Sequence, residues 1–331
     1  MSWIHRQDRG GARAPRGWSW ALLLVGVVAG CRGEGQGQGS APPAGTTAAS
    51  ATAAAQAPAS GSAKPSTAVG APVPPELVAK IMNPRGEATY SGPTGTLKGH
   101  VRIRGDAPPD TELSFPAGKC GEAAATYGRL FRVGQDGALA DALVTVVGYN
   151  GFVPEKEEAE KVTIHGCALA RRTLAVSFGQ RVEVSNLDPM ESYMPYLDGA
   201  PTRAVMVAVP RGDAVKLYPP MPGHYMIRDQ LPKPFMTSDV FVLKYATHDV
   251  TDLDGEYEIS GIPVGKATVV AYLPVLNDEV KQEIEIKEGE NLVDLELRFD
   301  LAKWKERKQK KAGAPPAGSS TAARPTGAPP K

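Results

Sequence analysis

Between residues 75 and 299 the hydrophobic residues occur in short runs, many alternating with polar residues, and Gly, Pro and Asp-Gly steps separate the runs. Alternation with a period of two, broken by such turn residues, is typical of half-buried β-strands. The pattern predicts an all-β fold of β-sandwiches built from many short strands. The expected strands are residues 95–103, 142–147, 173–176, 181–185, 204–208, 214–218, 238–245, 256–259, 266–272, 280–286 and 292–299.

Two segments have helical character instead. Residues 75–81 begin with proline and carry Glu76 in the first turn, both of which favour a helix start. Residues 300–311 are rich in lysine and predict a basic helix, followed by a disordered tail to residue 331. This helix lacks a broad apolar face, so a solvated segment is favoured over one that binds anionic lipid or polysaccharide through Trp304.

The first apolar run, residues 18–28, follows a cationic start with four arginines. It is shorter than the roughly 20 residues that a membrane-spanning helix needs. Residues 1–30 therefore read as a signal peptide. Val28-Ala29-Gly30-Cys31 resembles a bacterial lipobox, which implies lipidation of Cys31 and attachment to a membrane of the cell envelope. Arg32 follows that cysteine in place of the aspartate that often retains lipoproteins at the inner membrane, so by analogy we expect the outer membrane, on its periplasmic or surface face.

Residues 31–74 consist almost entirely of Ala, Gly, Ser, Pro, Thr and Gln. Such a composition buries too little apolar surface to fold, so it predicts a disordered linker. The stretch from 75 to 299 holds 23 Lys and Arg against 32 Asp and Glu, a net charge of −9. Since nucleic-acid binding needs clustered basic residues, this charge argues against a nucleic-acid partner.

Cys120 and Cys167 are the two cysteines other than Cys31. An even pair in an oxidising compartment predicts a disulfide. Two free thiols or a metal pair are the alternatives, although the spacing is not the short Cys-x-x-Cys of a metal site.

Residues 251–272 contain an Asp254-Gly255 turn followed by a second corner at 262–265. Together with strands at 99–103 and 137–146, they resemble the carboxypeptidase regulatory-like (transthyretin-like) β-sandwich. The resemblance implies one sandwich split into halves at 95–150 and 247–299. The acidic loop at 252–258 is better explained as a hairpin turn than as a calcium loop, because its glycine comes too early for an EF-hand.

Residues 163–246 fill the gap between these halves. Gly179-Gln-Arg-Val-Glu-Val-Ser-Asn186, with Asp188 and the later Pro222-Gly223 turn, resembles the cupredoxin (plastocyanin-like) copper fold. In that family two His, one Cys and a weak axial Met hold the copper. Here Ser192-Tyr193 and Lys233 stand where the histidines belong, no cysteine follows Cys167, and only Met236 matches. The resemblance therefore implies an inserted cupredoxin-like domain that lacks its copper ligands.

Three binding hypotheses follow. The first is a ligand face at the former metal end of this domain, made by Ser192, Tyr193, Met194, His224, Lys233, Phe235 and Met236. The second is copper binding by Met221, His224 and Met226, since thioether and imidazole ligands suit Cu(I). The third is a carbohydrate-binding module that uses exposed tyrosines.

Three other histidines have no metal-ligand spacing, so a shared metal site is not favoured; these are His100, His165 and His248. No hydrolase signature is present, although a pair of distant carboxylates stays open. The sequence thus predicts a non-catalytic envelope lipoprotein without a required cofactor, which binds an envelope protein or glycan or has a structural role.

Overall fold

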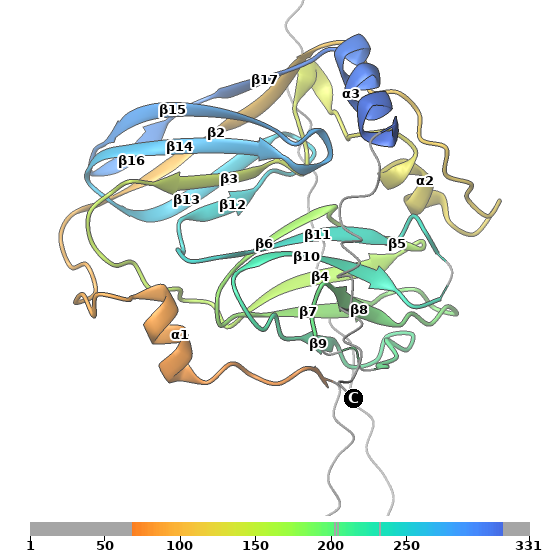
Figure 1. Cartoon of the computed structure of the whole chain (residues 1–331), viewed down its shortest axis with the longest axis horizontal. Helices are drawn as coiled ribbons and strands as arrows, with labels where there is room; N and C mark the ends of the chain where they lie inside the picture. Colours follow the sequence, from red (N-terminus) through yellow and green to blue (C-terminus); the bar gives the residue numbers. More distant parts are fainter. Residues whose placement is uncertain (1–67, 202, 204, 232, 314–331) are drawn as a thin grey trace, which may run out of the picture. The chain divides into compact units, whose positions relative to one another are not determined.

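The computed structural model describes residues 68–201, 203, 205–231 and 233–313. The predicted signal peptide, lipidation site Cys31, most of the linker and the tail beyond residue 313 lie outside the described residues. Within them, the chain is mostly strand, as the sequence predicts (Figure 1). No helix in this part of the chain is both long and apolar enough to span a membrane.

The strands form two sandwiches, one nested in the other. The outer sandwich pairs two sheets. One sheet has the order β12 (His248–Val250), β3 (Leu143–Val147), β14 (Gly265–Leu273) and β15 (Asp278–Ile286). The other has β13 (Glu256–Pro263), β2 (Thr94–Gly105) and β16 (Gly289–Leu292), and β17 (Leu295–Phe299) also pairs with β2.

The inserted sandwich is formed by the chain between β3 and β12, with β1 added from the N-terminal side. Its first sheet has the order β1 (Ala68–Val69), β9 (Val215–Leu217), β7 (Arg181–Asn186), β4 (Ala159–His165) and β5 (Ala168–Leu169). Its second sheet has β6 (Thr173–Ser177), β11 (Thr237–Leu243), β10 (Gly223–Asp229) and β8 (Pro195–Asp198). The predicted arrangement, a sandwich split by a second sandwich, is confirmed.

Each sandwich has its own core. Leu174, Val184 and Ile227 are fully buried in the inserted sandwich, and Leu97 and Val269 are fully buried in the outer one. A third, smaller apolar cluster of Leu143, Ala175 and Val250 lies between the second sheet of the inserted sandwich and the first sheet of the outer one. We call this contact between the two sandwiches the seam.

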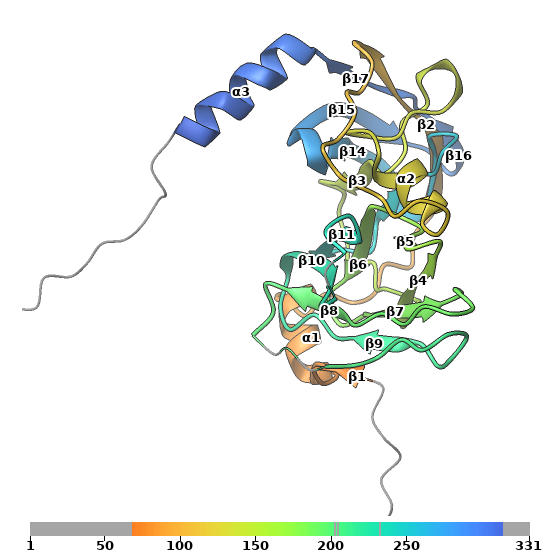
Figure 2. The ribbon, with the colours of Figure 1, turned by 90° about the vertical axis from the view of Figure 1, so that its right-hand side faces the viewer.

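Three α-helices and two short 3-10 helices, Gln135–Gly137 and Pro274–Leu276, complete the described chain. α1 (Pro75–Met82) and α3 (Leu301–Gly313) fall where the sequence predicts helices. Figure 2 shows α3 following β17 at the end of the outer sandwich. α2 (Gly121–Tyr127) was not predicted, since its seven residues are too few for a helical period to be recognised.

The predicted disulfide between Cys120 and Cys167 is present, with 5.1 Å between the two Cα atoms. Cys120 precedes α2, which lies between β2 and β3 in sequence. Even so, Cys120, Ala123 and Tyr127 are buried in the core of the inserted sandwich. The disulfide therefore ties a connection of the outer sandwich to the inserted one.

Three predicted segments need correction. The linker is too long by several residues, because Ala68 and Val69 pair in parallel with β9. Residues 205–208 form no strand in the described structure. Ala208 alone bridges to Tyr193, and Val205 is 63% exposed. The inserted sandwich begins at Ala159, where β4 pairs with β7, and not at residue 163.

The predicted strand 292–299 is also interrupted, and the side chain of Asp294 explains the break. Its Oδ1 accepts the backbone N–H of His100 at 2.9 Å, in place of a backbone carbonyl. The chain passes so close to β2 here that a Cβ on Gly99 would lie 1.8 Å from the Val293 carbonyl oxygen. Only glycine fits such an approach, so β16 and β17 pair with β2 on either side of it.

Candidate functional site

The ligand face predicted from the sequence would lie at the end of the inserted sandwich where β7 and β10 finish. We call this region the loop end. β7 ends at Asn186, whose Nδ2 donates to the carbonyl oxygens of Glu191 at 2.7 Å and Ala208 at 2.8 Å. Its Oδ1 accepts the backbone N–H of Asp188 at 3.0 Å. These bonds hold the loop after β7 in a fixed turn, which places Asp188 inside the protein.

Asp188 is the polar centre of this loop end. Its carboxylate accepts the backbone N–H groups of Gly166 at 2.6 Å and Cys167 at 3.2 Å, and the hydroxyl of Tyr193. Burial by itself would raise the pKa of this carboxyl, but the hydrogen bonds outweigh burial and hold the pKa of Asp188 below its usual range. Asp188 thus stays ionised as a structural anchor that links the β7 loop to the disulfide.

Tyr193 is one of the two residues that the sequence resemblance aligned with a histidine of the copper fold. Its side chain is fully buried, and burial, followed by the bond to Asp188, raises the pKa of its hydroxyl. Lys233 covers the ring, with its Nζ 4.4 Å from the ring centroid and 3.6 Å from Oδ2 of Asp229. The aromatic ring and the ammonium group close this end of the sandwich.

The predicted ligand face is not a continuous surface, which corrects the sequence prediction. Tyr193, Phe235 and Met236 are buried in the core, while Ser192 and Met194 are half-buried. The sequence could not distinguish a lining residue from a core residue here, because aromatic and Met side chains serve in both.

His224 lies away from that end, since it stands five positions before Asp229 near the start of β10. At the rise of an extended strand these two residues are roughly 16 Å apart. Its ring stacks on Phe241 at 4.7 Å, and Phe241 in turn meets Tyr272 of the outer sandwich edge-to-face at 5.8 Å. His224 therefore belongs to the seam.

The alternative copper set is only partly brought together. His224 and Met226 lie on the same face of β10, two positions apart, and Met221 precedes the strand and is 47% exposed. Nε2 of His224 already lies 2.7 Å from Oδ1 of Asp239, and Arg228 donates to the Met226 sulfur at 3.4 Å. Across the described residues, no cluster of three or more His, Cys, Asp or Glu side chains is suited to a metal.

A blue-copper centre does not fit the residues at the loop end. Its thiolate ligand has no counterpart there, because Cys120 and Cys167 are joined to each other. Tyr193 and Lys233 contribute a hydroxyl bound to Asp188 and an ammonium group, and neither replaces an imidazole ligand.

The other histidines lie in separate settings. His100 faces Asp294 and Glu256, with nitrogen–oxygen distances of 3.3 and 3.5 Å, and lines an open cavity of about 810 Å³ on the outer sandwich. His165 is exposed at the end of β4. His248 is at the seam, where its Nε2 lies 3.2 Å from the hydroxyl of Ser177, which donates to Oε2 of Glu155 at 2.6 Å.

The buried imidazole of His248 makes the free energy of unfolding depend on pH. Burial lowers the pKa of His248 below 6.5, and the nearby Glu155 opposes this only in part. On acidification, His248 is therefore protonated in the unfolded chain at a higher pH than in the folded protein. The free energy of unfolding thus decreases as pH falls through 6.5 towards the pKa of His248 in the folded protein. We expect His248→Gln, which keeps a nitrogen donor, to flatten the fall in urea midpoint between about pH 7.5 and about pH 5.5. His165→Gln is the exposed control, and parallel curves for His248→Gln and the unchanged protein would contradict this expectation.

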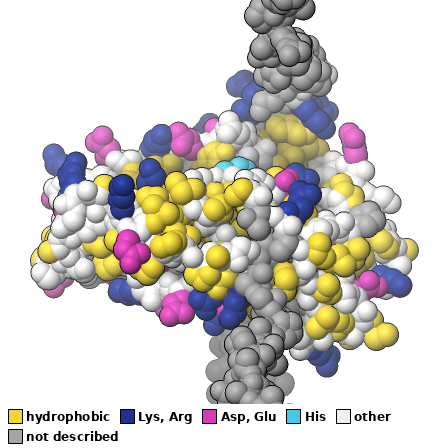
Figure 3. Space-filling view, turned by 60° about the horizontal axis from the view of Figure 1, so that its bottom comes forward, with side chains coloured by type: hydrophobic (Ala, Val, Ile, Leu, Met, Phe, Trp, Pro, Cys, Tyr) yellow, Lys and Arg dark blue, Asp and Glu magenta, His cyan; other side chains and the backbone are white. Residues whose placement is uncertain are grey.

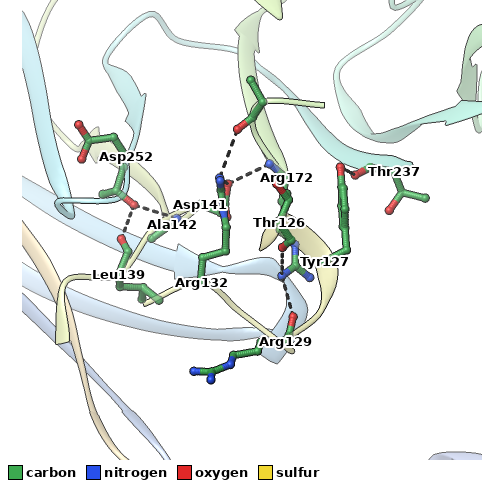
Figure 4. A network of polar contacts seen from close by, with 12 residues as sticks. Thr126, Tyr127, Arg129, Arg132, Leu139, Asp141, Ala142, Arg172, Thr237 and Asp252 are labelled. Carbon is green, nitrogen blue, oxygen red and sulfur yellow. Dashed lines mark hydrogen bonds and ion pairs between the residues drawn. The ribbon is translucent and has the colours of Figure 1, made fainter. Parts of the chain in front are cut away.

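Sequence reasoning missed a buried polar network at the seam (Figure 4). Asp141, 4% exposed, accepts Nε and Nη2 of Arg132 at 2.7 and 2.6 Å and the backbone N–H of Arg172 at 2.9 Å. Arg172 donates through Nη1 to the carbonyl oxygen of Arg129 at 3.1 Å. In sequence, Asp141 precedes β3 of the outer sandwich, whereas Arg172 precedes β6 of the inserted one. No local sequence pattern could therefore have paired them.

Comparisons with known proteins give structural likenesses only. No protein-family profile matches the chain, and no curated protein is similar to it. A reduced amicyanin variant is 20% identical over 30% of this chain and 98% of its own, with a TM-score of 0.23. A second amicyanin variant is 21% identical with the same coverage and TM-score. A copper-containing nitrite reductase from Thermus scotoductus SA-01 is 17% identical over 29% of this chain and 25% of its own, also with a TM-score of 0.23. At these scores the likenesses support no conclusion about what this chain binds or does.

Proposed function

We propose that the chain is a non-catalytic lipoprotein of the bacterial cell envelope, anchored through Cys31, that binds an envelope protein or glycan. Its scaffold would be a copper-free cupredoxin-like sandwich nested in a carboxypeptidase regulatory-like sandwich. The observation that carries the proposal is Tyr193, which is fully buried with its hydroxyl on Asp188. The sequence resemblance aligns this residue with a copper ligand, and a side chain held in this way would leave no room for a metal at that position.

The location rests on the sequence of residues 1–31 and on the disulfide. A disulfide between Cys120 and Cys167 is typical of proteins outside the reducing cytoplasm. A lipid tether followed by a long linker would let the folded body reach partners at a distance from the membrane.

The cluster of Ser177, Glu155 and His248 is not arranged for nucleophilic catalysis. In nucleophilic catalysis the imidazole lies between the acid and the nucleophile. Here the serine hydroxyl lies between Glu155 and His248, and Ser177 is fully buried. A hydroxyl in that place relays hydrogen bonds across the seam and has no access to a substrate.

A Cu(I) competition titration of the purified full chain tests the proposal. We expect no one-to-one binding above the level of nonspecific sites. One-to-one binding that is lost in His224→Ala and kept in His165→Ala would overturn it in favour of copper handling by Met221, His224 and Met226. His165 is a matched control because it is an exposed histidine of the same sandwich.

Copper handling is the second candidate function, because His224 and Met226 share one face of β10. It is disfavoured by the short contact between His224 and Asp239, which a metal on Nε2 would have to displace.

The surface of the protein fits the proposed binding role. On the face shown in Figure 3, hydrophobic side chains lie among charged and polar ones, which suits a surface that binds a polar partner.

A further inference from the structure

A cavity of about 260 Å³ lies at the seam between the two sandwiches. The outer sandwich contributes the apolar residues Phe131, Leu273 and Val275, and also the carboxylate of Asp141, whose two oxygens are already held by Arg132. The inserted sandwich contributes Arg172 and Asp239, one positive and one negative side chain. A cavity on which apolar and charged groups converge suits a small molecule that carries both kinds of group.

Arg172 brings a positive charge without a carboxylate partner of its own. Asp141, the nearest acid in the network, is already held by both nitrogens of the Arg132 fork, and Arg172 reaches it only through its backbone N–H. The guanidinium donates through Nη1 to the carbonyl oxygens of Arg129 and Thr126, at 3.1 and 3.5 Å. Its Cζ lies 5.5 Å from the centroid of the Tyr127 ring, and it makes no ion pair within the described chain. A guanidinium has five N–H donors in a planar fork that matches a carboxylate.

The electrostatic setting of Arg172 points the same way. Burial lowers its pKa, and the charges of Asp141, Tyr127 and Asp239 oppose this without cancelling it. An anionic group that enters the cavity would stabilise the charged form of such a guanidinium.

Asp239 supplies the opposite charge. It lies on β11 opposite Met226 of β10, and its side chain is 25% exposed. Its Oδ1 is 2.7 Å from Nε2 of His224. A carboxylate has two oxygens and about four acceptor positions, so this one contact leaves capacity for an ammonium group.

We infer that the seam cavity binds a small zwitterion with an aliphatic side chain, that is, an apolar α-amino acid. Its carboxylate would meet Arg172, its ammonium group Asp239, and its side chain the wall of Phe131, Leu273 and Val275. The volume equals that of about nine liquid-water molecules, which suits a ligand of this size. The inference goes beyond the proposed function, because it concerns a different site and does not depend on whether copper binds.

Isothermal titration of the purified full chain with leucine tests the inference. We expect one-to-one binding, with 4-methylpentanoate (carboxylate only) and 3-methylbutylamine (ammonium only) each at least about ten-fold weaker, since each lacks one charged hydrogen bond. Arg172→Gln and Asp239→Asn are expected to weaken leucine binding by at least about ten-fold. The matched control is Arg171→Gln, which removes the neighbouring arginine, 48% exposed and bound to Glu160 outside this cavity.

Three results would overturn the inference. The first is no heat of binding with leucine at about 1 mM. The second is equal affinity for leucine and 4-methylpentanoate, which would indicate a simple anion site. The third is an equal loss in Arg171→Gln and Arg172→Gln. If Arg172→Gln does not fold, the three-ligand comparison on the unchanged protein still decides.

Discussion

Asp141→Asn is expected to lower the free energy of unfolding by about 3–5 kcal/mol, the cost of leaving one partner of a buried ion pair uncompensated. The Arg132 side chain is 14% exposed and that of Asp141 6%, so water has little access to replace the lost partner. Although burial opposes it, the carboxylate of Asp141 keeps the pKa of Arg132 raised. Asparagine is the informative replacement because it tolerates the left-handed backbone that Asp141 adopts, with φ at 64°.

Urea unfolding of the purified full chain measures this effect. Asp110→Asn is the matched control, because Asp110 faces Arg129 at 3.9 Å on the surface, with side chains 88% and 69% exposed. An exposed pair of this kind is worth about 1 kcal/mol at most. Adding Arg132→Met to Asp141→Asn should restore part of the loss, since no buried guanidinium then lacks a partner. A loss below about 1 kcal/mol for Asp141→Asn would show that the seam tolerates an unpaired charge.

Removing the disulfide is expected to cost about 4 kcal/mol, from the chain entropy that a closed loop of this length takes from the unfolded state. Cys120 and Cys167 are separated by 47 positions. The bridge also fixes α2 on the inserted core, where Tyr127 donates its hydroxyl to the carbonyl oxygen of Thr237 at 2.9 Å. Loss of the bridge should therefore loosen α2 as well.

Cys120→Ser with Cys167→Ser is the test, compared with the unchanged protein in urea with and without a reductant. Reductant should lower the midpoint of the unchanged protein to that of the double variant and leave the double variant unaffected. Cys31→Ser is the control for the remaining cysteine. An unchanged midpoint in the double variant would mean that packing alone holds α2 in place.

The sequence alone predicted most of the fold because the strand signal is local. Alternation of apolar and polar residues at 266–272 corresponds to β14, where burial alternates along the strand. The Asp254-Gly255 turn is also local, since Gly255 takes φ of 73°, a value that glycine adopts freely. Failures came where local signals conflict with long-range contacts: residues 205–208 have strand-like composition, but only Ala208 finds a partner there.

The site was harder to predict, because the residue types at the loop end do not reveal which side chains face the core. The resemblance to the copper fold predicted that copper ligands are missing, yet only the tertiary structure shows that Asp188 holds Tyr193 and that His224 stacks on Phe241 at the seam. Likewise, Asp141 and Arg172 are 31 positions apart, and their contact needs both sandwiches in place. Local patterning determined the strands and their turns, and the nested order of the two sandwiches followed from the two family resemblances. The buried charges, the seam and its cavity were decided by tertiary packing, because they arise where segments distant in sequence exclude water together.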